Sequence, residues 1–110
     1  MATQSDRPLN ETQFLILLVL VDRERHGYGI VKEIEVRTGG RVRLEPGNLY
    51  RFVKKLMELG FLRDAEAPRG ADAHERRRYF ALTEDGRIAL RDDAARMRSL
   101  VQALEARLTP

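Results

Sequence analysis

A single stretch, residues 44–62 (LEPGNLYRFVKKLMELGFL), constrains the fold most because it has two opposed faces. With about 100° between successive residues of a helix, its apolar side chains gather on one side and its cations on the other. The apolar side consists of Leu49, Phe52, Val53, Leu56 and Gly60, with Met57 at its edge. We therefore expect a helix that packs on a hydrophobic core with one face and presents the other outward.

The outward face of this helix carries the side chains that double-stranded DNA requires. Arginine pairs with guanine, and asparagine pairs with adenine, in the major groove; lysine and tyrosine hold phosphates. The predicted DNA-binding residues of the helix are Asn48, Tyr50, Arg51, Lys54 and Lys55. The alternative interpretation is an ordinary solvated helix face, since charged residues are common on protein surfaces.

Residues that cap helices, glycines that end them and alternating apolar residues divide the rest of the chain into expected helices and strands. We expect helices over about 11–21, 27–38, 46–59 and 84–110, and strands over 41–44, 61–67 and 76–82. Asn10 and Thr83 are expected N-caps, and Glu45 is expected to cap the two-faced helix, with Pro46 in its first turn. Residues 22–26 are expected to form a polar connector, in which His26 acts as a structural cap.

This order of elements predicts a mainly α fold with a small β-hairpin (α+β), namely a winged helix-turn-helix with an added C-terminal dimerisation helix. The expected parts are a flexible tail at 1–9, a winged-helix DNA-binding domain at 10–82 and the dimerisation helix at 83–110. A length of 110 residues fits one domain. The hairpin is the expected wing, and its cations predicted to contact DNA are Arg69, Arg76, Arg77 and Arg78.

Composition limits the other classes of protein. The chain has no cysteine, which excludes disulfides and thiolate metal sites and fits a reducing cytoplasm. The longest apolar run, 14–21, is too short for a bilayer that needs about 20 residues, and a signal peptide is not evident. No catalytic constellation and no metal-ligand spacing surround the two histidines. We therefore expect a soluble cytoplasmic protein with no enzymatic activity, metal or cofactor.

Three motifs carry a resemblance to a known family. They are HGYGIVKEI (26–34), EPGNLYRFVKKLMELGFL (45–62) and RRRYFALTEDGRIAL (76–90). In this order and spacing they resemble the PadR family of winged-helix transcriptional regulators. Two positions depart from the family pattern: Glu45 stands where Ser or Thr is usual, and Arg51 where proline is frequent. Both departures affect the DNA-facing helix, so operator preference does not carry over.

The resemblance implies a homodimer, in most relatives a repressor, that binds a palindromic operator. It implies that Tyr50 and its neighbours contact DNA, that Gly70 lies at the wing tip, and that a single C-terminal helix dimerises. It also implies release from DNA by a small aromatic or hydrophobic effector in some members. Phe14, Tyr28 and Met97 are candidates to line a ligand pocket, but such residues are more often part of a core.

The last helix carries apolar residues at spacings of four and three, the a/d pattern of a coiled coil. The predicted dimer interface comprises Leu90, Ala94, Met97, Val101, Leu104 and Leu108 of this helix, with Phe14, Leu17 and Leu18 of the first helix. The alternative is a helix that packs on its own domain. A two-fold axis would place two DNA-reading helices about 34 Å apart, one turn of DNA.

Together these patterns predict a sequence-specific DNA-binding transcriptional regulator. The competing hypothesis is a winged-helix module for protein–protein interaction, with the basic face docked on an acidic partner. That module would show no DNA affinity beyond the weak, salt-sensitive background of any basic protein.

Overall fold

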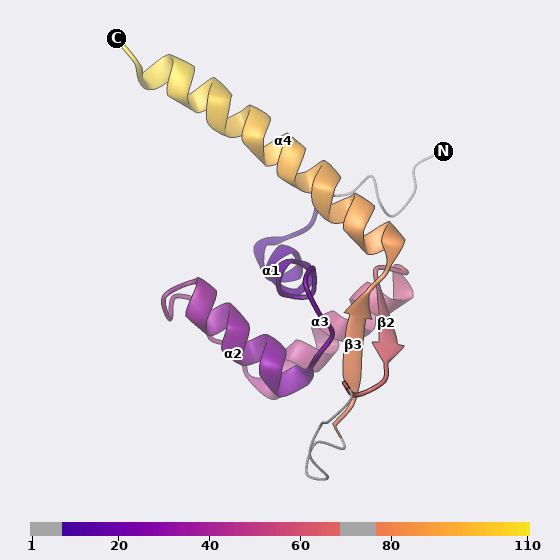
Figure 1. Ribbon diagram of the computed structural model, residues 1–110. Coiled ribbons are helices and arrows are strands. Elements are labelled where there is room, and N and C mark those ends of the chain that lie inside the picture. Colours follow the sequence, from indigo (N-terminus) through magenta and orange to yellow (C-terminus); the bar gives the residue numbers. More distant parts are fainter. Residues whose placement is uncertain (1–7, 69–76) are drawn as a thin grey trace.

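The computed structural model describes residues 8–68 and 77–110. Its elements, in chain order, are α1 (Glu11–Val19), β1 (Arg25–His26), α2 (Gly27–Arg37), α3 (Pro46–Glu58), β2 (Leu62–Ala65), β3 (Tyr79–Leu82) and α4 (Glu84–Leu108) (Figure 1). The strands form an antiparallel sheet in the order β1-β3-β2. The predicted α+β winged-helix fold is confirmed.

Side-chain caps start three of the four helices. The acceptors are Asn10 Oδ1, His26 Nδ1 and Thr83 Oγ1, which accept hydrogen bonds from the backbone N–H groups of Gln13 at 2.8 Å, Gly29 at 2.9 Å and Gly86 at 3.0 Å. Each bond satisfies a donor that the first helical turn leaves unpaired. These three predicted caps are confirmed. Glu45 occupies the N-cap position of α3, but its side chain makes no capping hydrogen bond.

The core lies between α1, α2, α3 and the sheet. Its largest fully buried side chains are Phe80, Ile16, Leu17, Ile30, Ile34, Leu49, Leu56, Val19 and Val53. The start of α4 covers this core with Ala89 and Leu90, both buried. At the other end of the chain, Leu9 packs against the core although we assigned it to the tail, whose residues 1–7 lie outside the described residues.

The expectation of a strand at 41–44 is wrong. These residues form no strand, and their alternating pattern reflects burial alone. Val42 and Leu44 pack against the core, while Arg41 and Arg43 are exposed. The third strand is β1, inside the expected connector, and it pairs with β3 through the registers Arg25↔Phe80 and His26↔Tyr79. A two-residue strand held by backbone pairing leaves no alternation in the sequence, and so it was not predicted.

The hairpin formed by β2 and β3 is confirmed, with strands shorter than expected. Its register runs from Leu62↔Leu82 to Ala65↔Tyr79. Residues 69–76 lie outside the described residues, and these include Arg69, Gly70 and Arg76 of the predicted wing. The described base of the wing therefore ends at Pro68, after β2, and resumes at Arg77, before β3.

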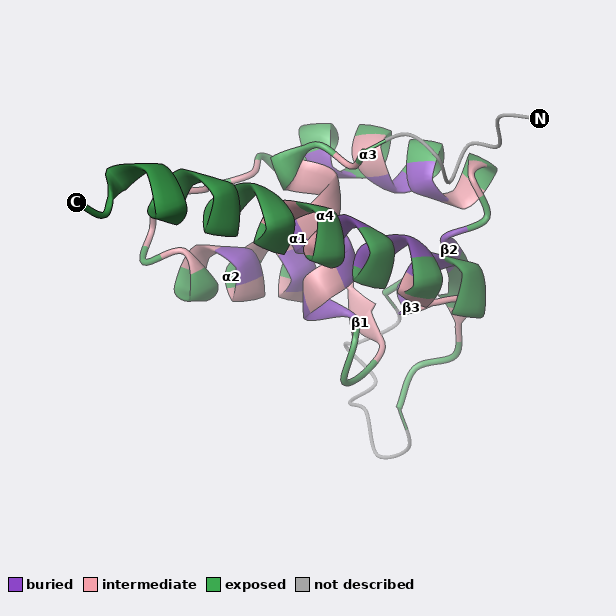
Figure 2. Cartoon of the chain, turned by 90° about the horizontal axis from the view of Figure 1, so that it is seen from above, coloured by how far each residue is buried: buried purple, intermediate pink, exposed green. Residues whose placement is uncertain are grey.

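Helix α4 projects away from the body of the protein (Figure 1). Its first turns pack on the core, whereas its C-terminal half is exposed all round (Figure 2). In the part of the chain that the structure describes, no helix has the length and apolarity needed to cross a membrane.

Candidate nucleic-acid interface

Helix α3 has the two faces that its sequence predicts. Leu49, Val53 and Leu56 are buried, and Phe52 and Met57 are half-buried beside them. The opposite face is exposed to solvent; Figure 2 shows this division along the helix. The exposed side chains of the predicted DNA-binding set are Asn48, Tyr50, Arg51, Lys54 and Lys55. The predicted orientation of α3 is therefore confirmed.

Some arginines elsewhere in the fold are bound by carboxylates, whereas the cations of this face are not paired in the described part of the chain. Arg37 pairs with Glu33 at 3.0 Å, and Arg41 pairs with Glu11 at 2.9 Å. By contrast, among the described residues no carboxylate forms an ion pair with Arg51, Lys54 or Lys55. Within the described residues, the charge on α3 is thus not neutralised by ion pairs and is available to an anionic partner.

Tyr50 stands at the boundary between the two faces of α3 and is 45% exposed. Its ring meets Phe80 edge to face, with centroids 6.3 Å apart. Its hydroxyl reaches Gly27 at the start of α2, where a β-carbon would stand 2.9 Å from the oxygen. Tyr50 therefore braces α3 against both the sheet and α2, and a glycine at position 27 permits that close approach.

At the base of the wing, the two described arginines behave differently. Arg78 is bound by Asp64 of β2, with Nε to Oδ1 at 2.6 Å and Nη2 to Oδ2 at 3.2 Å. These hydrogen bonds hold the pKa of the Asp64 carboxyl below its usual value and raise the pKa of Arg78. Arg77 has no acidic partner within the described ranges, and its guanidinium lies over the Tyr28 ring, 5.4 Å from the centroid.

The expectation that Tyr28 lies in the core is wrong. Tyr28 is 54% exposed, and the Lys32 ammonium lies 5.7 Å from its ring centroid. Both residues belong to α2, outside the predicted DNA-binding set.

A cavity of about 270 Å³ joins this part of α2 to the start of α3 and the base of the wing. It is lined by Gly27, Tyr28, Val31, Pro46, Leu49, Tyr50, Arg77 and Arg78. The sequence signal that could have identified Tyr28 and Lys32 is their spacing: side chains four residues apart lie on the same face of a helix.

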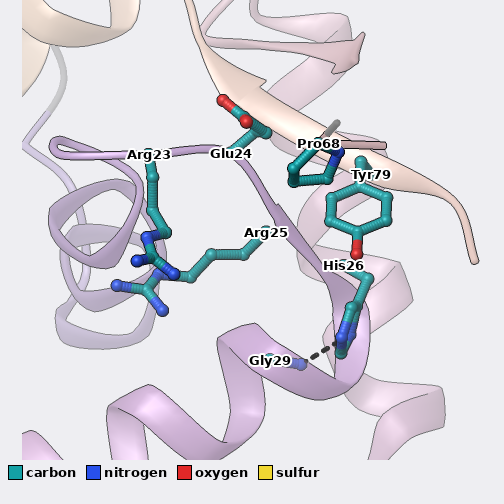
Figure 3. A pocket seen from close by; sticks show the side chains of 7 residues that line it. All are labelled: Arg23, Glu24, Arg25, His26, Gly29, Pro68 and Tyr79. Carbon is teal, nitrogen blue, oxygen red and sulfur yellow. Dashed lines mark hydrogen bonds between the residues drawn. The ribbon is translucent and has the colours of Figure 1, made fainter. Parts of the chain in front are cut away.

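A second cavity, of about 480 Å³, opens between the segment before α2 and the base of the hairpin (Figure 3). It is lined by Arg23, Glu24, Arg25, His26, Gly29, Pro68 and Tyr79. In Figure 3 the guanidinium groups of Arg23 and Arg25 lie near each other. Arg25 Nε donates to the Val19 carbonyl oxygen at 2.7 Å. This charged lining does not suit a purely hydrophobic ligand.

The residues predicted for a dimer interface fall into three groups by burial. Leu17 and Leu90 are buried within the protomer and offer no surface to a second copy. The half-buried members are Phe14, Leu18, Ala94 and Met97, and the exposed members are Val101, Leu104 and Leu108. Leu100, which the heptad pattern omits, is also exposed.

Within the described ranges, no group of three or more His, Cys, Asp or Glu side chains is arranged to hold a metal ion.

Comparison with known proteins identifies one matching family. The model of the family described as "Transcriptional regulator PadR-like family" matches residues 16–92. A curated relative, an uncharacterized 37.1 kDa protein in a transposon of Streptomyces fradiae, is 37% identical over 91 residues. The match covers 83% of this chain and 24% of that relative, so the chain spans about a quarter of its length.

Two solved structures show how far the likeness extends in three dimensions. A PadR family transcription regulator from hypervirulent Clostridium difficile has a TM-score of 0.74 and 22% identity, and the match covers 91% of this chain and 100% of that chain. This likeness shows the fold. Bacillus subtilis PadR, solved in complex with operator DNA, has a TM-score of 0.62 and 25% identity, over 77% of this chain and 47% of that chain.

Proposed function

The chain belongs to the PadR-like family of transcriptional regulators, and on that premise we propose that it is a homodimeric repressor which binds palindromic operator DNA. The exposed face of α3 enters the major groove, and the wing contacts the adjacent backbone. The protein acts in the cytoplasm. The observation that carries the proposal is the face of α3 itself, whose cations are exposed and unpaired within the described chain while its apolar side is fixed to the core.

The geometry of α3 suits direct reading of bases. Asn48 and Arg51 lie in the N-terminal half of the helix, the part that a helix-turn-helix presents to base edges. Arginine and asparagine are the side chains that pair in two-pronged fashion with guanine and adenine. Lys54 and Lys55 follow on the same exposed side and suit phosphates, which set the register. Bacillus subtilis PadR, which has this fold, was solved in complex with operator DNA, and this supports DNA as the partner.

The exposed half of α4 supports the homodimer. An isolated helical segment of about ten residues is marginal in water, and the stripe of Val101, Leu104 and Leu108 has nothing to cover it in the described chain. A second copy of α4 would bury this stripe and stabilise the helix at once. Met97, half-buried at the start of the stripe, connects it to the body of the protein.

Repression and release by a small aromatic or hydrophobic effector remain predictions from the family. Repression by occupation of a promoter would require only tight operator binding. The rival hypothesis, a module for protein–protein interaction, would use the same basic face on an acidic partner. The two hypotheses differ in one measurable quantity, which is the ratio of specific to non-specific DNA affinity.

The test is selection of bound sequences from a random pool of duplex DNA at physiological salt, with the full chain. The proposal predicts enrichment of an inverted repeat whose half-sites are centred about one helical turn apart. Enrichment of a single half-site would support DNA binding and count against the dimer. Recovery of unselected sequences, with an affinity that disappears as salt rises, would overturn the proposal in favour of the rival module.

A further inference from the structure

We propose that Tyr28, Lys32 and Arg77 form a phosphate-binding cluster that holds the sugar–phosphate backbone of the operator beside α3. The cluster joins two elements, α2 and the base of the wing, that meet only in the folded chain. It rests on the proposed function, because its ligand is the DNA that α3 reads. It adds a contact to α2 that neither the sequence pattern nor the comparisons assign.

The centre of the cluster is the Tyr28 ring. The Lys32 ammonium lies 5.7 Å and the Arg77 guanidinium carbon 5.4 Å from its centroid. Both distances are within the range of cation–π attraction, so the exposed ring holds two cations beside it. An ammonium, a guanidinium and a phenol are three donors that bind phosphate oxygens in protein–DNA interfaces.

The charge of the cluster is only partly neutralised. Lys32 lies 3.6 Å from Glu35, but the same carboxylate is 3.3 Å from Arg43, so one anion serves two cations. Arg77 forms no ion pair with any residue in the described portion of the chain. An anion at the cluster would therefore relieve the mutual repulsion of Lys32 and Arg77.

The position of the cluster suits backbone rather than bases. The adjoining cavity of about 270 Å³ is lined by Tyr28 and Arg77 together with Pro46 and Tyr50 of α3, so it lies beside the N-terminus of the proposed reading helix. That N-terminus lacks a side-chain cap, since Glu45 makes no capping hydrogen bond. Its free backbone N–H groups and helix dipole favour a negative charge there. With α3 in the groove, the neighbouring element contacts the strand that borders it.

The test compares three variants of the full chain on a selected operator duplex and on an unrelated duplex, over a series of salt concentrations. Lys32→Gln removes one cation, and Tyr28→Phe removes one hydroxyl while keeping the ring. The matched control is Arg37→Gln on the same helix, about 140° around its axis from Lys32 and paired with Glu33. Unfolding curves establish that each variant retains the fold.

We expect Lys32→Gln to weaken binding to both duplexes about fivefold and to reduce the slope of log affinity against log salt by about 0.9, the value for one phosphate contact. Tyr28→Phe should weaken both duplexes by a smaller factor, and Arg37→Gln should bind as wild type. Operators that carry one uncharged methylphosphonate provide a second readout. At one backbone position the substitution should weaken wild type and leave Lys32→Gln unaffected.

Three results would overturn the cluster. If Lys32→Gln and Tyr28→Phe bind like wild type with an unchanged salt slope, the cluster is wrong and the reading role of α3 stands. If these variants lose affinity for the operator alone, the residues read bases and do not hold backbone. If wild type binds no duplex above the non-specific background, the proposed function fails and the cluster fails with it.

Discussion

Arg78 and Asp64 bind each other across the hairpin through two hydrogen bonds, with Nε to Oδ1 at 2.6 Å and Nη2 to Oδ2 at 3.2 Å. The pair joins β2 to the residue just before β3, and the guanidinium also lies over the Phe80 ring at 5.1 Å. Arg78 belongs to the set that the sequence predicted to contact DNA. Because its guanidinium already has an anionic partner, its first role is to hold the base of the wing together.

We expect Asp64→Asn to lower stability slightly at neutral pH and to have no effect in strong acid. The hydrogen bonds from Arg78 lower the pKa of Asp64 in the folded chain. The pair therefore contributes stability above the unfolded pKa of about 4, and this contribution is lost as pH falls through the lower folded-state pKa. Denaturant midpoints of both proteins, measured from about pH 2 to pH 7, should converge in acid.

The effect of Asp64→Asn should be small, because both side chains of the pair are more than half exposed and solvent screens them. Glu66→Gln is the matched control, since it removes a carboxylate two residues away that forms no ion pair within the described ranges. A difference between Asp64→Asn and wild type that stays constant with pH would contradict the electrostatic explanation.

Gly86 is expected to be indispensable to the packing of α4. A β-carbon at this buried position would overlap the carbonyl oxygen of Phe61 and come within 2.8 Å of Leu82 Cδ1. The backbone oxygen cannot move aside without disturbing the turn that leads into β2. We therefore expect Gly86→Ala to destabilise the fold by about 2–4 kcal/mol, measured by urea unfolding monitored by circular dichroism.

Gly47→Ala provides the control for this substitution. Gly47 lies in the first turn of α3, and a β-carbon there would meet nothing within 4 Å. Alanine should therefore be neutral or stabilise the fold by up to about 1 kcal/mol through the unfolded state. If the two alanine variants had equal stability, the close approach of α4 to Phe61 would not be a constraint on the fold.

The features that the sequence predicted correctly are those that a local pattern determines. The two faces of α3 follow from helical periodicity alone, and the caps at Asn10, His26 and Thr83 follow from residue type and position. Each of these requires only neighbours within one or two turns. The fold class followed from the order of such elements.

The features that the sequence did not predict depend on contacts between distant segments. The pairing of β1 with β3 joins residues 25–26 to 79–80, and no alternation of apolar and polar residues in the sequence indicates it. The aromatic side chain of Tyr28 favoured a place in the core, but in the fold the residue lies exposed on α2, beside Arg77. Glycine is a poor helix former, and the reason for Gly86 in α4 is the close approach of the Phe61 backbone, which lies far away in the sequence.

Substitutions on α3 should separate base reading from backbone binding. We expect Arg51→Ala to cost about 1–3 kcal/mol on the selected operator and to relax preference at one base position. Lys55→Ala should weaken all sequences alike and reduce the salt slope by about one. Affinities for the operator and for single-base variants, measured at several salt concentrations, distinguish the two patterns. Both side chains are exposed, so neither substitution should change the unfolding curve.

The control for the α3 variants is Arg43→Ala, which removes an exposed cation that precedes α3 and pairs with Glu35. It should leave base preference unchanged. Wild-type affinity and preference in both α3 variants would contradict the assignment of this face to DNA and leave the interaction module as the better explanation.

A charge placed in the exposed stripe of α4 should separate the proposed dimer into monomers. Leu104 is 57% exposed in the protomer, so Leu104→Glu should leave the domain folded. In the proposed dimer the same position faces a second α4, and two buried carboxylates there would repel each other without partners. Sedimentation at micromolar concentration should show a monomer. Circular dichroism should show reduced helicity from the uncovered end of α4, and binding to a full palindrome should be weaker.

Gln102→Glu, which adds the same charge outside the stripe, should remain dimeric. A Leu104→Glu protein that stays dimeric and keeps its operator affinity would exclude the C-terminal half of α4 from the interface.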